Sequence, residues 1–324
     1  MLQSSTGDRS ATSGVAELSV KRTSPEEERP RVIYVMGAGR SGSTTLGITL
    51  GNCTDVFYAG ELDNWLVRSG VPQVQDDERL EFWGKVRDGL QDDERAAQLF
   101  GNRAQRAIER SVSLFRVREW PTRHRLRRSY RAVAEDLYRA LTRASGSKII
   151  ADTSHYPLRA RELQRAAGID LYLVFLVRDP QGVVASFGRR DVHEFTKSTL
   201  HTNTYLWLTH LLSMLVFVRH PRDRRLFVRY EDFVIDPAGV LRQILEVSGS
   251  STKTLPDFRA LDTGVPLQGN RVSRSDKLSL KPSSDPVPRT SRATTVLQAP
   301  LLALLSRMRP VASASRDQDD TRLH

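Results

Sequence analysis

Short apolar runs alternate with stretches of helical period along most of the chain. The runs at 31–36, 55–59, 147–151, 171–177 and 226–229 predict buried strands. Helices are predicted at 43–50, after Pro157, after Pro180, over about 198–219 and after Pro237. Because strands that alternate with helices form parallel sheets, we predict a three-layer α/β domain, in which helices cover both faces of a parallel sheet.

The stretch at 70–146 interrupts this alternation and predicts an inserted helical cap. Apolar side chains, among them Ile108, Val112 and Phe115, recur three or four residues apart, which is the period of an amphipathic helix. A second, arginine-rich helix is predicted at about 124–145. Acceptor specificity is expected to lie in this cap.

The two ends of the chain differ in composition from the predicted domain at 31–275. Residues 1–30 are rich in Ser, Thr, Arg and Glu without periodicity and predict a disordered leader. Residues 276–324 are rich in Ser, Pro and Arg, and the last fifteen are predicted to be disordered. The longest apolar stretch, 206–218, is too short to cross a bilayer, and no secretory signal precedes the domain, so a soluble cytoplasmic protein is expected.

Charge and cysteine content narrow the classes of partner. The chain has 49 basic and 38 acidic residues, a formal net charge of +11, which favours an anionic partner. Ten arginines and two acidic residues lie between 103 and 131, a stripe that is either a solvated helix face or a contact surface for an acidic acceptor. The single cysteine, Cys53, excludes an internal disulfide and a cysteine-based metal cluster, and no metal is expected.

A glycine- and hydroxyl-rich segment, Gly37-Ala-Gly-Arg-Ser-Gly-Ser-Thr-Thr45, lies between the first predicted strand and the first predicted helix. Backbone N–H groups of such a turn bind phosphate at the positive end of the helix dipole. The segment therefore predicts an anion site.

Two common phosphate-binding loops fit this segment incompletely. Gly37, Gly39 and Gly42 match the G-x-G-x-x-G pattern of a dinucleotide-binding oxidoreductase, and Glu61 lies nineteen residues beyond Gly42, near the place of a ribose-binding acid. As a Walker A loop the segment lacks the lysine, because Ser43 occupies its place. A basic nucleic-acid-binding module is the non-enzymatic alternative.

A third interpretation rests on two motifs taken together. Arg40-Ser-Gly-Ser-Thr-Thr-Leu46 resembles the RSGST(T/S)L signature of sulfotransferases that use 3'-phosphoadenosine 5'-phosphosulfate (PAPS). Arg178-Asp-Pro-Gln-Gly-Val-Val-Ala-Ser186, after the strand at 171–177, resembles the second signature of that family, RDPRxVxxS. Two phosphate sites in this order are much more specific than either motif alone.

Three weaker matches extend the resemblance over about 31–275. Asp152-Thr-Ser-His-Tyr-Pro157 is similar to the D-(S/T)-S-K-x-P stretch of bacterial members, with His155 where lysine is usual. Arg229-Tyr-Glu-Asp-Phe233 resembles an RYEDL segment, and Gly269-Asn-Arg271 resembles the late G-N-x-R loop that closes over the nucleotide. The cap matches no motif of the family.

The resemblance implies a P-loop-like sulfotransferase fold and transfer of a sulfuryl group from PAPS to a hydroxyl of a small-molecule, carbohydrate or lipid acceptor, leaving adenosine 3',5'-bisphosphate. It implies that the 5'-phosphosulfate is held by Arg40, Ser41, Gly42, Ser43, Thr44 and Thr45, with Arg40 also stabilising the leaving group. Arg178 and Ser186 would bind the 3'-phosphate, and Arg271 would close over the nucleotide.

The acceptor hydroxyl needs a general base, and two residues are candidates. Several bacterial carbohydrate members of the family use a glutamate in a context that resembles Ala59-Gly60-Glu61, so Glu61 is the first choice. His155 is the second, because it follows a strand on the expected ligand side of the sheet and other members use a histidine. Either side chain would also contact the acceptor.

Overall fold

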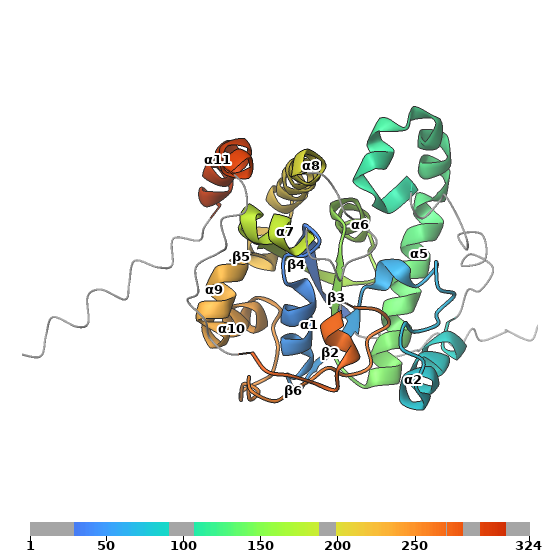
Figure 1. Cartoon of the computed structure of the whole chain (residues 1–324). Coiled ribbons are helices and arrows are strands. Elements are labelled where there is room, and N and C mark those ends of the chain that lie inside the picture. Colours follow the sequence, from blue (N-terminus) through green and yellow to red (C-terminus); the bar gives the residue numbers. More distant parts are fainter. Residues whose placement is uncertain (1–28, 91–106, 188–198, 270, 281–291, 309–324) are drawn as a thin grey trace, which may run out of the picture.

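The computed structural model describes residues 29–90, 107–187, 199–269, 271–280 and 292–308 (Figure 1). Nearly all of the predicted leader, the first part of the periodic pattern in the cap and the last fifteen residues lie outside these ranges.

A five-stranded parallel sheet forms the centre of the molecule, as predicted. Its strands are β1 (Arg31–Gly37), β2 (Val56–Gly60), β3 (Ile149–His155), β4 (Asp170–Val177) and β5 (Arg225–Arg229). Their order across the sheet is β2-β3-β1-β4-β5, with β1 in the middle. All five carboxyl ends therefore meet at one edge of the sheet, where the glycine-rich segment follows β1.

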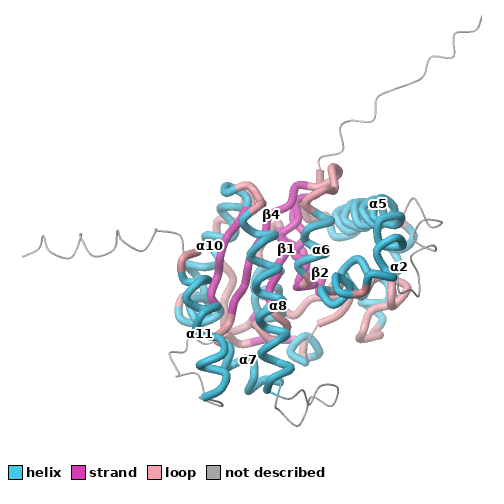
Figure 2. The backbone as a smooth tube through the Cα atoms, turned by 90° about the horizontal axis from the view of Figure 1, so that it is seen from above, coloured by secondary structure: helices cyan, strands magenta, loops and turns pink. Residues whose placement is uncertain are grey.

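Alternate residues of β1 face two separate layers of apolar side chains. Ile33 and Val35 pack with α1 (Ser43–Gly51) and α10 (Pro237–Val247), next to which lies α9 (Tyr230–Ile235). Val32, Tyr34 and Met36 face α6 (Pro157–Leu163), α8 (Thr199–Val218) and α5 (Trp120–Ser145). The tube view shows α6 and α8 lying over the strands on this second face (Figure 2). The three-layer α/β prediction is confirmed.

The strand order argues against the dinucleotide-binding alternative. In that fold the first two strands along the chain are neighbours, in the order 3-2-1-4-5-6. Here β3 lies between β1 and β2, so Glu61 at the end of β2 is one strand further from the glycine-rich segment than a ribose-binding acid would be.

In the described ranges the cap contains α2 (Asp77–Asp88), the short 3-10 turns η2 (Ser111–Phe115) and η3 (Val117–Glu119), and α5. Helix α2 packs on α5 at one edge of the sheet. The predicted amphipathic period does not continue through these turns: Ile108 is buried, but Val112 is 54% exposed and Phe115 is 71% exposed. Because the two 3-10 turns replace a regular helix, side chains three or four residues apart no longer share one buried face.

Short elements connect and close the layers. These are η1 (Leu62–Asn64), α7 (Pro180–Phe187), η4 (Arg222–Arg224), η5 (Arg271–Arg274) and the antiparallel pair of β6 (Leu261–Asp262) and β7 (Lys277–Leu278). A further helix, α11 (Arg292–Ser306), was not predicted; it packs on α7 and α8. No helix in the described ranges combines the length and apolar character needed to span a bilayer.

Candidate active site

The glycine-rich segment forms a loop that holds α1 against the end of β1. Gly42 precedes the helix in the left-handed region, with φ 91°, and a Cβ there would collide with the ring of Tyr230. The first turn of α1 contains no acidic side chain that would neutralise the helix dipole. Ser41 is 1% exposed, and its hydroxyl has no hydrogen-bond partner in the described part of the chain. A buried, unpartnered hydroxyl beside a helix N-terminus fits a bound anion.

The two predicted phosphate loops meet at their arginines. Nη1 of Arg178, directly after β4, donates to the backbone oxygen of Arg40 over 3.2 Å. The Arg178 guanidinium also lies 4.6 Å from the ring centroid of Tyr230. Neither Arg40 nor Arg178 is within ion-pair distance of a carboxylate among the described residues. The two guanidinium groups at this edge of the sheet are therefore suited to bind an anion.

The segment after β5 contacts both the glycine-rich loop after β1 and the loop after β4. Tyr230 packs against Gly42 on one side and against Arg178 on the other. The next residue, Glu231, accepts a hydrogen bond from the backbone N–H of Asp179 over 2.8 Å. The R-Y-E-D match therefore marks residues that fix the two loops to each other. Sequence reasoning found the motif but not this role.

Helix α7 begins at the second loop, and the side chain of Asp179 accepts from the backbone N–H of Gln181 over 2.7 Å at its start. Ser186 lies on this helix and is half-buried. The structure thus places Ser186 on the helix that Arg178 precedes.

Glu61 follows β2 and forms hydrogen bonds with Gln268, a residue of the late loop. Its backbone N–H donates to the oxygen of Gln268 over 2.9 Å, and Gln268 Nε2 donates to its carboxylate over 3.4 Å. Burial raises the pKa of Glu61 to about 7; the Gln268 hydrogen bond opposes this, the charge of Asp152 adds to it, and Arg40 lowers it. A carboxylate that titrates near neutrality suits proton abstraction.

His155 is the last residue of β3, with a left-handed φ of 56°. Its Nε2 lies 3.9 Å from the place that a Cβ on Gly39 would occupy, so the imidazole is beside the glycine-rich loop. Burial lowers the pKa of His155 to about 4, and the ring is therefore neutral at neutral pH. The structure brings both candidate bases to the same edge of the sheet.

Tyr205 of α8 is a site residue that sequence reasoning missed. Its hydroxyl accepts a hydrogen bond from the backbone N–H of Gly39 over 2.8 Å, and burial raises its pKa. Because Tyr205 lies in a largely apolar helix, nothing in its local sequence distinguishes it from a core residue.

The late loop, which the family resemblance implied would close over the nucleotide, lies beside the first turn of α1. A Cβ on Gly269 would lie 3.5 Å from Cγ2 of Thr44, in the first turn of α1. Arg271 begins η5, which packs on α1, but its side chain lies outside the described residues, as does Asn270.

A buried polar network supports the end of β3. Asp152 accepts from Tyr138 over 2.6 Å and from Arg159 over 3.1 Å. Arg159 also reaches Glu109 over 3.0 Å and Tyr130 over 2.6 Å. This network explains why β3 continues through Asp152 to His155, beyond the predicted end of the strand at residue 151: the polar side chains are buried with partners.

A match to a known protein family agrees with this geometry. A family model described as "Sulfotransferase family" matches residues 30–253, from β1 through α10. No curated protein matches the chain. Among solved structures, the sulfotransferase domain of the Synechococcus PCC 7002 olefin synthase is 19% identical, with a TM-score of 0.47, over 86% of this chain and 97% of that one. A sulfotransferase from Alicyclobacillus acidocaldarius is 15% identical, with a TM-score of 0.44, over 87% of this chain and 97% of that one.

The family match covers the loops that follow β1 and β4, the segment after β5, and Glu61 after β2. It includes every site residue discussed above except those of the late loop. On the family match and the convergence of its motifs at one sheet edge, the chain belongs to the sulfotransferase family.

Proposed function

We propose that this sulfotransferase uses PAPS as donor and transfers the sulfuryl group to a hydroxyl of a small-molecule, carbohydrate or lipid acceptor. The observation that carries the proposal is the contact between Arg178 and Arg40, neither of which is within ion-pair distance of a carboxylate in the described ranges, beside the buried Ser41 hydroxyl. A nucleotide with a phosphosulfate at one end and a 3'-phosphate at the other would satisfy both loops at once.

Each part of the loop pair has a role in this proposal. Ser41, Ser43, Thr44 and the N-terminal N–H groups of α1 would bind the phosphosulfate of PAPS, whose terminal sulfuryl group is the one transferred. Arg40 would stabilise the charge that collects on the leaving phosphate as the S–O bond breaks. Arg178 and Ser186 would hold the 3'-phosphate.

Glu61 is the proposed general base. As the acceptor oxygen bonds to sulfur, its proton would pass to the Glu61 carboxylate. Glu61 is favoured over His155 because a base with a pKa of about 7 is both ionised and basic enough at neutral pH, whereas a pKa of about 4 makes the imidazole a weak proton acceptor.

A thermal-shift comparison tests the donor assignment. Adenosine 3',5'-bisphosphate, AMP and NAD are added separately to the full chain in EDTA. We expect the bisphosphate to give the largest rise in melting temperature, because only it has the 3'-phosphate that the second loop would bind. A ligand at a hundred times its Kd stabilises the folded state by about 2.7 kcal/mol. NAD should give no shift. The absence of a bisphosphate shift in EDTA, or a larger NAD shift, would contradict the proposal.

An acceptor panel completes the test. PAPS is incubated with representative carbohydrates, lipids and small hydroxyl compounds, and released adenosine 3',5'-bisphosphate is measured by chromatography. Turnover with one class, lost in Arg40→Ala, would support the transfer; turnover that survives Arg40→Ala would contradict the role of the loop.

A further inference from the structure

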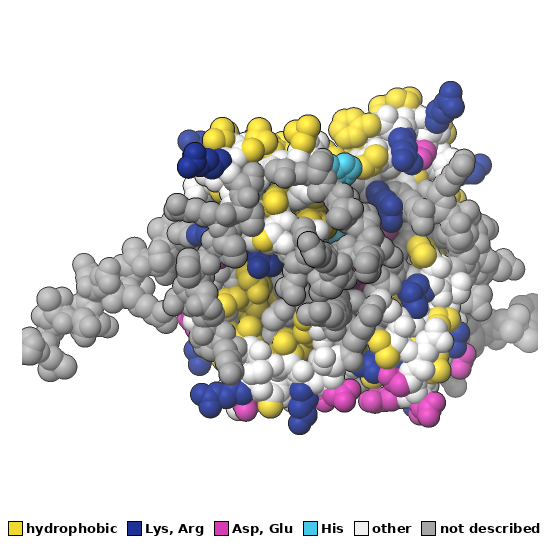
Figure 3. All heavy atoms as spheres, viewed as in Figure 1, with side chains coloured by type: hydrophobic (Ala, Val, Ile, Leu, Met, Phe, Trp, Pro, Cys, Tyr) yellow, Lys and Arg dark blue, Asp and Glu magenta, His cyan; other side chains and the backbone are white. Residues whose placement is uncertain are grey.

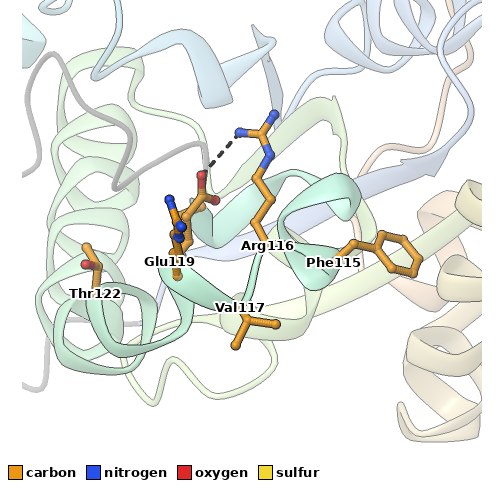
Figure 4. A pocket seen from close by; sticks show the side chains of 7 residues that line it. Phe115, Arg116, Val117, Glu119 and Thr122 are labelled. Atoms are coloured by element: carbon orange, nitrogen blue, oxygen red, sulfur yellow. Dashed lines mark hydrogen bonds and ion pairs between the residues drawn. The ribbon is translucent and has the colours of Figure 1, made fainter.

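The cap carries exposed apolar side chains that no described part of the chain covers. Phe115 is 71% exposed, Val117 is 65% exposed and Trp120 is 52% exposed, on two consecutive turns and the start of α5. We refer to Val112, Phe115, Val117 and Trp120 as the cap crest. Figure 4 shows Phe115 and Val117 extending on the side away from the ion pair of Arg116 and Glu119, which has a length of 3.2 Å. These two apolar side chains also border a hollow of about 500 Å³.

The apolar surface continues from the cap onto two neighbouring helices. Turn η2 lies against α8, and α8 lies against α11. On these helices Leu200 is 69% exposed and Val296 is 72% exposed. The space-filling view shows hydrophobic side chains gathered along the top of the molecule, above α11, α8 and the cap, with basic side chains among them (Figure 3). Soluble proteins rarely leave so extended an apolar surface without a partner.

A basic pocket lies directly beside the crest. It has a volume of about 300 Å³ and is lined by Leu114, Trp120, Arg123, His124, Arg127 and Arg161. Trp120 thus belongs both to the crest and to the pocket wall. An apolar edge and a cationic pocket share one side chain.

Three arginines line the pocket, and the nearby carboxylate of Glu162 can balance the charge of only one of them. Glu162 is fully buried and lies 3.1 Å from Nε of Arg127. Arg123 is 5% exposed, yet its Nε and Nη2 have no hydrogen-bond partner in the described part of the chain. Burial, then the neighbouring Arg127, lowers the pKa of Arg123, although Glu162 opposes the shift. A buried guanidinium with two unused donors in a pocket of arginines fits a phosphate group.

We propose that the cap crest docks on an anionic phospholipid surface, with a lipid phosphate in the Arg123 pocket and Phe115, Val117 and Trp120 at the edge of the hydrocarbon. Apolar and aromatic side chains interleaved with arginines are the pattern that an anionic bilayer interface binds. The formal charge of +11 acts in the same direction. This docking is independent of the donor assignment, because none of these residues belongs to the two strand-end loops.

Vesicle sedimentation with the full chain tests the proposal. Vesicles of phosphatidylcholine alone are compared with vesicles that also contain phosphatidylglycerol. The wild type should sediment only with the anionic vesicles, and less so as salt is raised, because an ionic attraction to the surface is screened. The double variant Phe115→Ser, Val117→Ser should lower the partition coefficient about tenfold or more. Arg161→Gln, in the pocket wall, should lower it about fivefold.

Matched variants on the opposite side of the sheet provide the control. Ile235 of α9 is 58% exposed and Arg242 of α10 is also exposed, so Ile235→Ser and Arg242→Gln remove similar groups away from the crest. Both should sediment as the wild type does. Absence of binding to anionic vesicles, or an equal loss in crest and control variants, would overturn the proposal. Competition by soluble glycerol phosphate with no effect of the crest variants would also overturn it, in favour of a pocket for a free anion or an acidic protein.

Discussion

At the level of single residues, burial moves the pKa values of the two candidate bases in opposite directions. It disfavours the charged form of each, so the Glu61 pKa rises to about 7 and the His155 pKa falls to about 4. Both side chains are therefore largely neutral just below neutral pH, but only Glu61 becomes a competent base as the pH rises through 7.

Glu61→Gln should separate basicity from shape. The amide keeps the acceptor oxygen for Gln268 but cannot take up the proton, so turnover should fall about 10²- to 10⁴-fold. Affinity for adenosine 3',5'-bisphosphate should change little, and the acidic limb of the pH–rate profile near pH 7 should disappear. If the variant keeps more than about a tenth of the rate, less than the smallest effect expected of a base, the role passes to His155 and His155→Ala becomes the decisive variant.

The same substitution should change the pH dependence of stability. A folded-state pKa raised from 4.5 to about 7 means that Glu61 favours folding in acid and that this contribution is lost as the pH rises through 7. Glu61→Gln, which stays neutral, should therefore have a higher free energy of unfolding than the wild type above about pH 8, by up to about 3 kcal/mol. The two proteins should converge below about pH 4 in urea unfolding. If the difference in free energy of unfolding between the two proteins does not vary with pH, burial does not disfavour the ionised form of Glu61.

Sequence alone pointed to the residues of the candidate site whose signal is local. Arg40 and Arg178 follow strands inside recognisable motifs, and Glu61 follows a short apolar run. Tyr205 and Gln268 were missed because each reaches the site over more than a hundred residues of chain, through one hydrogen bond that no periodicity encodes.

At the level of elements, β3 shows where periodicity fails. The apolar run ends at residue 151, but the strand continues to His155 because the buried Asp152 forms an ion pair with Arg159 and accepts a hydrogen bond from Tyr138. That network also connects the cap to the sheet, since Tyr138 lies on α5 and Glu109 precedes η2. A polar run is buried here because its partners come from other elements.

Arg159→Met should reveal the cost of these buried carboxylates. Removal of the guanidinium leaves Asp152 and Glu109 without their shared cation, which should destabilise the fold by about 3–5 kcal/mol. Arg165→Met, on the exposed side of the turn after α6, is the control and should unfold as the wild type does in urea. A loss no larger than that of the control would argue against the charge explanation.

Helix α11 was missed for a different reason. Its surroundings are rich in Ser, Pro and Arg, and Pro300 lies within the helix itself. The structure accounts for it by contacts from other helices: Trp207 of α8 donates to the oxygen of Leu297 over 2.8 Å, and Gln298 donates to Asn203 over 2.8 Å. Tertiary contacts override a weak local propensity here.

At the level of the whole molecule, the sheet order explains how distant motifs form one site. With β1 between β3 and β4, the segments that follow these three strands meet around the N-terminus of α1. The alternation of strands and helices predicted the parallel sheet, but the order of its strands could not be derived from periodicity, because every strand is apolar in the same way. That order is what distinguishes this chain from the dinucleotide-binding fold.

Calorimetric titration of Arg178→Ala with adenosine 3',5'-bisphosphate and with AMP tests the central claim most directly. If the two strand-end loops form one nucleotide site, loss of the guanidinium should weaken the bisphosphate by about 2–4 kcal/mol, because a charge-assisted contact to the 3'-phosphate disappears. AMP, which lacks that phosphate, should bind the variant and the wild type nearly equally, and both results should hold in EDTA. Equal weakening of the two nucleotides, or a requirement for metal, would contradict the account.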